Sequence, residues 1–199
     1  MHNRDVLISE VGPRDGLQSI TRTMPTHAKL NWIATLARSG LPEIEVGSFV
    51  SPKLLPQMAD AAEVVQGALA IGGFCVAALV PNLKGAERAM AAGARKISIP
   101  VSASRLHSLS NINMIPEQAV EQVAAIIRLR DGLAGPRPEV EAGISTAFGC
   151  TMEGQVDEAW VLRLAEMLAE AGADSINLAD TTGMGNPAQV RRLFRGLRS

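Results

Sequence analysis

The amino-acid sequence predicts an α/β fold of the TIM, or (β/α)8, barrel type, of which this chain supplies about six βα units. Apolar, β-branched runs alternate along the chain with segments of helical periodicity. Gly40, Gly93 and Gly172 each stand four residues before a strand isoleucine, which is typical of helices that return to parallel strands. Such turns favour repeated βα units joined by right-handed crossovers.

Polar residues inside two predicted strands favour a barrel over an open, doubly wound sheet. Glu45 lies between Ile44 and Val46, and Asn177 lies in a similar apolar run. A sheet covered by helices on both faces normally carries aliphatic side chains at such positions, whereas a barrel can direct them inward near its mouth. No Gly-x-Gly-x-x-Gly follows the first strand, so a dinucleotide-binding open sheet has little support.

The expected elements follow one another in a regular order. Strands are predicted at residues 6–8, 44–46, 74–80, 96–101, about 140–147 and 175–179. Helices are predicted from an N-cap at Thr26 to Gly40, at 61–71, at 83–92, from Pro116 through Ile127, from about Asp157 to Gly172, and from the Asn186-Pro187 cap onward. A long polar loop through Asn111 and Asn113 is expected after the fourth strand.

Composition limits the class of protein. With 199 residues, of which 47% are hydrophobic and 20% charged, the chain can bury one substantial core, and we expect a single, incomplete barrel domain over 1–199. The net charge of −1 and the lack of a basic run argue against nucleic acid or a membrane surface as a partner. We expect a cytoplasmic protein, because the first residues run into a strand without a signal-peptide pattern. Cys75 and Cys150 do not suggest a disulfide framework.

The most informative stretch is 10–18, Glu-Val-Gly-Pro-Arg-Asp-Gly-Leu-Gln. It places Arg14 and Asp15 just past the carboxyl end of the first strand, and nothing in the local sequence neutralises them. Functional sites of α/β proteins collect at that end of the strands. The alternative interpretation is an ordinary loop ion pair beside a turn glycine.

Several motifs in order resemble the 3-hydroxy-3-methylglutaryl-CoA lyase family, a branch of the metal-dependent TIM-barrel lyases and Claisen enzymes. The similarity covers essentially the whole chain. It rests on residues 10–18, 44–53, 56–60, 80–85, 111–113, 148–154 and 178–183.

The resemblance implies retro-Claisen cleavage of a 3-hydroxyacyl-CoA, which gives acetyl-CoA and acetoacetate from hydroxymethylglutaryl-CoA. Arg14 would be the cation that faces the developing enolate, and Asp15 a carboxylate ligand of Mg²⁺ or Mn²⁺. Glu45 and Asp180 would be catalytic carboxylates at the barrel mouth, unless they only cap strand ends in buried salt bridges. The partner would be a small acyl-CoA molecule, and the assembly a homodimer.

Further polar residues are weaker candidates. Gln18, Ser48 and Asn111 could hydrogen-bond the substrate or coenzyme A, although short polar residues at loop starts are more often turn formers. Cys150 is expected to be a packing residue. The histidines His2, His27 and His107 match no metal ligand of the family, and we expect them at the surface.

The chain also departs from the family pattern. The family continues into a His-x-His strand and a glycine-rich loop with a catalytic cysteine, which no position here supplies. We therefore expect a chain truncated at its carboxyl end, with weak affinity for divalent ions and no activity by itself. Residues 98–107 differ from the expected loop, so a related branched 3-hydroxyacyl-CoA is an alternative substrate. A Claisen condensing enzyme, such as an isopropylmalate or citramalate synthase, and a non-catalytic fragment that pairs with another chain remain open.

Overall fold

The computed structural model describes residues 6–198, in which strands and helices alternate from end to end. The strands are β1 (Ser9–Glu10), β2 (Glu43–Ser48), β3 (Cys75–Leu79), β4 (Lys96–Ser102), β5 (Glu139–Ser145) and β6 (Ser175–Leu178). The α-helices are α1 (Thr26–Arg38), α2 (Ala61–Ile71), α3 (Leu83–Ala92), α4 (Arg105–Ile112), α5 (Pro116–Asp131), α6 (Glu158–Glu170) and α7 (Pro187–Gly196). A π-helical turn, η1 (Gly12–Gly16), and a 3₁₀ turn, η2 (Pro56–Met58), complete the order.

Internal contacts divide the chain into two compact units. The first unit contains residues 1–98 and 134–138, and the second contains 99–133 and 139–199. In the sheet the strands follow their sequence order, β1 to β6. The strand pairs β1–β2, β2–β3, β3–β4 and β5–β6 are parallel, as the alternation of strands and helices predicts.

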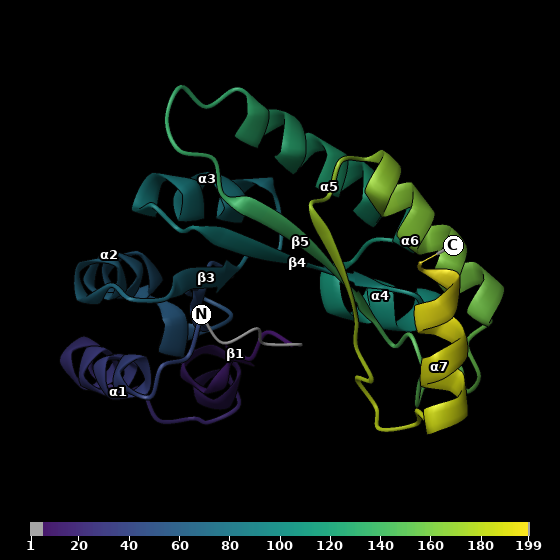
Figure 1. Ribbon diagram of the computed structural model, residues 1–199, viewed down its shortest axis with the longest axis horizontal. Helices are drawn as coiled ribbons and strands as arrows, with labels where there is room; N and C mark the ends of the chain where they lie inside the picture. The colour runs from purple at the N-terminus through teal and green to yellow at the C-terminus, as the bar shows by residue number, and fades with distance from the viewer. Residues whose placement is uncertain (1–5, 199) are drawn as a thin grey trace. The chain divides into compact units, whose positions relative to one another are not determined.

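The first unit builds its core between β2, β3 and the helices that follow them. Every residue of β2 is buried, and β2 pairs with β3 so that Glu43 lies opposite Cys75. Helix α2 packs against both α1 and α3, and the three helices follow one another along β2 and β3 in Figure 1. The apolar faces of these helices cover the strands, which is the usual way in which βα units bury a parallel sheet.

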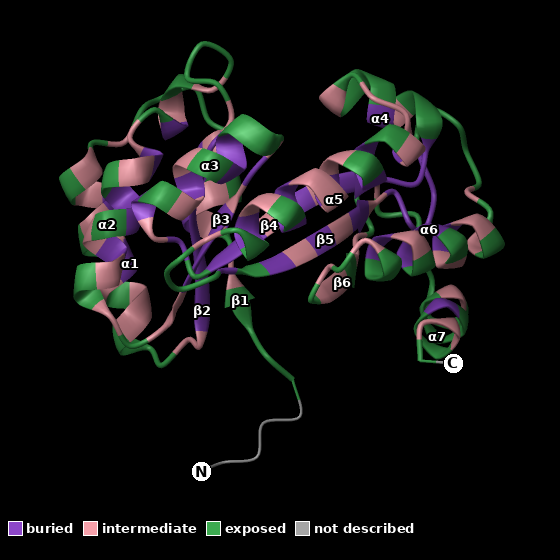
Figure 2. Ribbon diagram, turned by 90° about the horizontal axis from the view of Figure 1, so that it is seen from above, coloured by how far each residue is buried: buried purple, intermediate pink, exposed green. Residues whose placement is uncertain are grey.

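The second unit repeats this arrangement around β5 and β6. Val140, Ala142 and Ile144 alternate as buried residues along β5, and Glu141 lies opposite Ser175 of β6. Helices α5 and α6 contact each other, and α6 contacts α7. Figure 2 shows buried positions along β5 and on one side of α5 and α6. Among the described residues, no helix combines the length and apolar character needed to cross a membrane.

Many of the predicted elements are confirmed. Helices α2 and α3 begin and end where the sequence predicted, and the side chain of Asn186 caps α7 by accepting the N–H of Gln189. The turn glycines Gly40, Gly93 and Gly172 have φ angles of 79°, 90° and 97°. A left-handed backbone is the conformation that a helix-ending glycine provides.

Two predicted details near the start of the chain are wrong. The apolar run of Val6, Leu7 and Ile8 is not a buried strand, because these residues are 60–72% exposed and the strand is Ser9–Glu10. Thr26 is the first residue of α1 rather than its N-cap, which is Pro25, and the Thr26 hydroxyl instead donates to the carboxylate of Asp60.

The expected polar loop after the fourth strand is largely the helix α4. Ser104 caps it by accepting the N–H of His107 at 3.1 Å, and the helix ends at Asn113 in a left-handed conformation. Its serine and asparagine residues have weak helix propensity and therefore indicated a loop. The N-cap at Ser104 and packing in the tertiary fold stabilise the helix in spite of this weak propensity.

Candidate active site

The clearest cluster of charged side chains in the first unit surrounds Arg14. The chain leaves β1 and enters η1 at once, and such π-helical turns are frequent at functional sites. The Arg14 Nε and Nη2 atoms each lie 2.5 Å from Glu45 Oε2. The side chain of Glu45 is 5% exposed and that of Arg14 is 16% exposed. A buried carboxylate on β2 therefore fixes one edge of the guanidinium group.

The same guanidinium group contacts the second residue of the predicted pair. Arg14 Nη1 donates to Asp15 Oδ1 at 2.8 Å, and the Asp15 side chain is 65% exposed. The expectation that nothing local neutralises the two groups is therefore wrong, since Arg14 bridges two carboxylates. The Glu45 carboxylate is buried in the core, whereas the Asp15 carboxylate is exposed and can turn toward solvent or a ligand. The catalytic roles of Arg14, Glu45 and Asp15 stay predictions.

Two candidate substrate-binding residues lie in the same unit. Ser48 is fully buried at the end of β2, with its Oγ 3.5 Å from the N–H of Val50. The amide oxygen of Gln18 is buried and has no hydrogen-bond partner among residues 6–198. A buried acceptor without a donor is rare in folded proteins, and it is satisfied when a ligand supplies an N–H or O–H. Gln18 thus offers a free acceptor close in sequence to Arg14, and its role in substrate binding stays a prediction.

The buried lysine Lys29 connects the loops that follow β1 and β2 through hydrogen bonds. Lys29 on α1 is 1% exposed, donates to the Gln57 carbonyl at 2.6 Å and pairs with Asp60 at 2.5 Å. The Gln57 side chain in turn donates to the Ile20 carbonyl at 2.5 Å. The loop after Gln18 and the loop after Ser48 are therefore held to the same helix.

Lys29→Met is expected to lower the free energy of unfolding by about 3 kcal/mol, because it leaves the Asp60 carboxylate without its cation. Urea denaturation of the full encoded protein measures this loss. Lys53→Met, at an exposed position in the loop after β2, is the matched control and should change the stability little. Equal stabilities of the two variants would contradict a structural role for Lys29.

Asp180 and Asn111 belong to the second unit. Asp180 follows β6, is exposed, and accepts the backbone N–H groups of Met184 at 2.9 Å and Gly185 at 3.0 Å. It therefore orders the loop 181–185 through hydrogen bonds and is not buried, contrary to the capping alternative. Asn111 lies at an exposed position of α4 rather than in a loop. The functional roles of both residues stay predictions.

Cys150 is a fully buried side chain of the β5–α6 connection, where packing was expected. Burial raises the pKa of its thiol, but hydrogen bonds from Ser104 and from the backbone of Met152 and Glu153 outweigh burial and hold that pKa below its usual value.

The histidines are only partly as expected. His27 is exposed on α1, whereas His107 is half-buried, with Nδ1 2.7 Å from Ser102 Oγ, so the expected surface position of His107 is wrong. His2 lies outside the described residues.

The donor set of residues 6–198 does not fit a complete metal site. No group of three or more histidine, cysteine, aspartate or glutamate side chains gathers there in a ligating arrangement. Asp15 is the one metal ligand that the sequence predicted, and one oxygen of its exposed carboxylate accepts from Arg14. A divalent ion held by one carboxylate would bind weakly, since Mg²⁺ and Mn²⁺ prefer several oxygen ligands.

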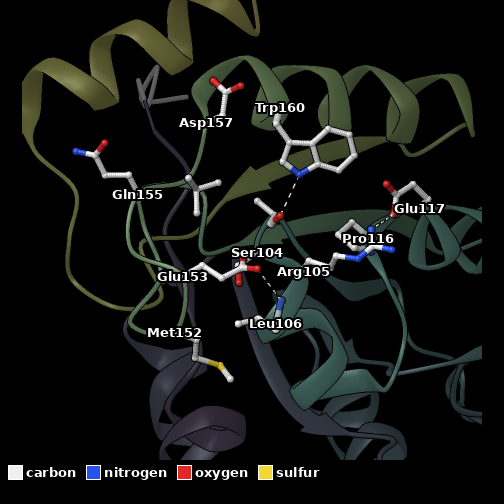
Figure 3. A pocket seen from close by; sticks show the side chains of 12 residues that line it. Ser104, Arg105, Leu106, Pro116, Glu117, Met152, Glu153, Gln155, Asp157 and Trp160 are labelled. Atoms are coloured by element: carbon white, nitrogen blue, oxygen red, sulfur yellow. Dashed lines mark hydrogen bonds and ion pairs between the residues drawn. The ribbon is translucent and has the colours of Figure 1, made fainter.

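The sequence did not predict a pocket that lies within the second unit. Figure 3 shows this cavity of about 490 Å³, which Arg105, Leu106, Met152, Glu153 and Trp160 help to line. Trp160 Nε1 donates to the Ala103 carbonyl at 3.0 Å, and the Leu106 N–H donates to Glu153 Oε1 at 3.2 Å. None of the predicted site residues lines it. Ala103–Leu106 belong to the stretch 98–107, which the sequence linked to the choice of acyl group, and Met152 and Glu153 belong to the motif 148–154. Their approach to one another depends on the tertiary fold, so neither stretch by itself indicated a pocket.

The two units together define a chain of consecutive parallel βα units with charged and polar residues directly after strands, as in barrel enzymes of the TIM type. A family model described as HMGL-like matches residues 5–199. The chain belongs to the HMGL-like family.

Individual relatives agree with this assignment. The mitochondrial hydroxymethylglutaryl-CoA lyase of Gallus gallus is 39% identical over 189 residues, which is 95% of this chain and 62% of the relative. The hydroxymethylglutaryl-CoA lyase of Bacillus subtilis is 39% identical over 194 residues, which is 98% of this chain and 64% of the relative. The chain thus spans about three fifths of the length of these relatives.

Solved structures confirm the predicted fold class. A crystal structure of the Bacillus subtilis HMG-CoA lyase matches with a TM-score of 0.90 and 38% identity, and covers 97% of this chain and 64% of that one. The HMG-CoA lyase of Acinetobacter baumannii, in complex with coenzyme A and 3-methylmalate, matches with a TM-score of 0.87 and 39% identity over 94% of this chain and 60% of that one. The chain is an α/β fold that carries six βα units of the barrel type.

Proposed function

We propose that the protein carrying this chain cleaves 3-hydroxy-3-methylglutaryl-CoA, or a close 3-hydroxyacyl-CoA, into acetyl-CoA and acetoacetate or its homologue. The observation that carries the proposal is the guanidinium group of Arg14, fixed by the buried Glu45 directly after β1. Support comes from relatives of 39% identity that are named hydroxymethylglutaryl-CoA lyases. A relative with bound coenzyme A supports an acyl-CoA as the substrate class.

The chemistry explains why an arginine is required. A base removes the proton of the C3 hydroxyl group, the C2–C3 bond breaks, and its electron pair forms the enolate of the thioester fragment. A proton then returns to the enolate carbon, so atoms and charge balance. The negative charge grows on the thioester oxygen, where a preorganised guanidinium group stabilises it. Because Glu45 fixes this group before the substrate arrives, little reorganisation is needed during the reaction.

The remaining roles are proposed for the residues that the sequence analysis named as candidates. Glu45 orients Arg14, while the exposed carboxylate of Asp180 moves a proton. Gln18 offers its free amide oxygen to a substrate N–H or O–H group, and Ser48 and Asn111 contribute further hydrogen bonds. Asp15 contributes one carboxylate toward Mg²⁺ or Mn²⁺. Residues 6–198 do not gather the further side-chain ligands that such an ion prefers.

We further propose a cytoplasmic homodimer whose residues 1–199 belong to a single barrel domain, with no nucleic-acid or membrane partner. The net charge of −1 supports the absence of polyanionic partners. A bacterial relative supports the cytoplasm, although other relatives are named as mitochondrial.

Incubation of the full encoded protein with hydroxymethylglutaryl-CoA should yield acetyl-CoA and acetoacetate in equal amounts. Coupled assays of the two products measure the reaction, in the presence and absence of added Mg²⁺ or Mn²⁺. Acetyl-CoA with pyruvate or 2-oxoisovalerate is the matched control, in which no free thiol of coenzyme A should appear. Release of that thiol without cleavage of hydroxymethylglutaryl-CoA would instead establish a condensing enzyme.

A further inference from the structure

Thr146, directly after β5, has an unusual backbone conformation. Its φ angle is +57°, and its side chain is fully buried. Among the described residues other than glycine, Asn113 alone shares a positive φ, and asparagine tolerates this region far better than a β-branched residue does. Such strain costs about 1–3 kcal/mol and persists only where the surrounding structure holds it. Backbone strain of this kind is concentrated at functional sites, so the residues that contact Thr146 can indicate what the strain is for.

Hydrogen bonds from Thr146 reach the ends of both neighbouring strands. Its N–H donates to Thr181 Oγ1 at 2.8 Å, just after β6. Its hydroxyl donates to the Ser145 carbonyl at 2.6 Å and accepts the N–H of Ser104 at 3.0 Å, just after β4. The left-handed conformation directs the N–H to one side, and the hydroxyl bonds hold that conformation. One residue thereby connects the carboxyl ends of three parallel strands.

Thr181 and Ser104, the two residues that Thr146 contacts on the neighbouring strands, also help to position other parts of the second unit. Thr181 is bonded in sequence to Asp180, whose carboxylate accepts the N–H groups of Met184 and Gly185. Ser104 caps α4 by accepting the N–H of His107. The backbone at Thr146 is therefore in a position to fix where the loop after β6 begins, and with it the direction of the Asp180 carboxylate.

We propose that Thr146 is a positioning residue, whose left-handed backbone aims its N–H at Thr181 and so orients Asp180. The proposal rests on the proposed function, in which Asp180 moves a proton. A merely structural role would require only a small side chain that fills the space. The orienting role requires the backbone conformation, which threonine keeps through its hydroxyl bonds and glycine keeps without strain.

Three substitutions separate these requirements. Thr146→Ser keeps the hydroxyl bonds, and Thr146→Gly keeps the left-handed backbone without a side chain. Thr146→Val preserves the volume but has neither property, because a β-branched side chain without hydrogen bonds relaxes to negative φ. Relaxation turns the N–H away from Thr181. Thr151→Val, at an exposed position of the same unit, is the matched control.

The test uses the full encoded protein and two measurements. Turnover of hydroxymethylglutaryl-CoA should fall roughly tenfold to a hundredfold in Thr146→Val with little change in KM, as expected when a reacting group is misplaced. The serine and glycine variants should stay within about threefold of the unchanged protein, on the same reasoning. Amide hydrogen exchange at Met184 and Gly185 should be faster in the valine variant alone, because Asp180 protects these N–H groups.

The outcomes decide the proposal. Unchanged exchange at Met184 and Gly185 in Thr146→Val overturns it, whether or not the protein cleaves the substrate. A glycine variant as impaired as the valine variant also overturns it, because the hydroxyl group and not the backbone would then be responsible. If the unchanged protein does not cleave hydroxymethylglutaryl-CoA, the proposed function fails, while the exchange data still decide whether Thr146 orients the Asp180 loop.

Discussion

Arg14→Lys in the full encoded protein is expected to lower kcat by about 10² to 10³, the usual effect of removing a preorganised group that stabilises an oxyanion. Lysine keeps the positive charge. However, a single ammonium group cannot hold Glu45 along one edge and Asp15 at another nitrogen, as the guanidinium group does. The charge would therefore be present but no longer fixed where the enolate forms.

Measurement of kcat and of the melting temperature separates chemistry from folding for this variant. The melting temperature should change little, because lysine retains an ion pair with Glu45. Arg38→Lys is the matched control, since Arg38 lies exposed on α1, where its side chain donates to the hydroxyl group of Thr35 on the same helix. Near-normal turnover of Arg14→Lys would remove Arg14 from the mechanism.

The Arg14 cluster could be anticipated from the sequence only in part. The position of Arg14 after the first strand and that of Glu45 within the second follow from local patterns of apolar and turn residues. Their contact depends on the register of β1 against β2, in which Glu10 lies opposite Ile44. Register is a property of two strands together, so local patterns do not determine it.

Other features had no usable local signal. The helix α4 contains two serines and an asparagine, which favour turns, and its N-cap Ser104 stands in a polar stretch that gives no clear helix start. The positive φ of Thr146 depends on hydrogen bonds to Ser104 and Thr181, which are 42 and 35 residues away in sequence. A threonine gives no intrinsic indication of such a conformation. For the run Val6–Ile8 the local signal is present but misleading. Its apolar pattern predicts a buried strand, yet these residues are exposed.

Glu45→Gln tests whether the buried carboxylate serves the chemistry as well as the fold. The change preserves the shape of the side chain but removes the charge that holds Arg14. It should lower the free energy of unfolding by about 3 kcal/mol, as expected when one partner of a buried ion pair is lost. It should also lower kcat by roughly 10², because the guanidinium group becomes free to move away from its productive position.

Glu43 makes this test unusually well controlled. It lies two residues earlier on the same strand, is equally buried, and pairs with Lys96 at 3.3 Å. Glu43→Gln should therefore cost a similar stability, about 3 kcal/mol, without a loss of kcat. Denaturant titration and steady-state kinetics on both variants give the comparison. If the two variants lose activity equally, the effect of Glu45 on turnover comes from general destabilisation of β2 and not from its hold on Arg14.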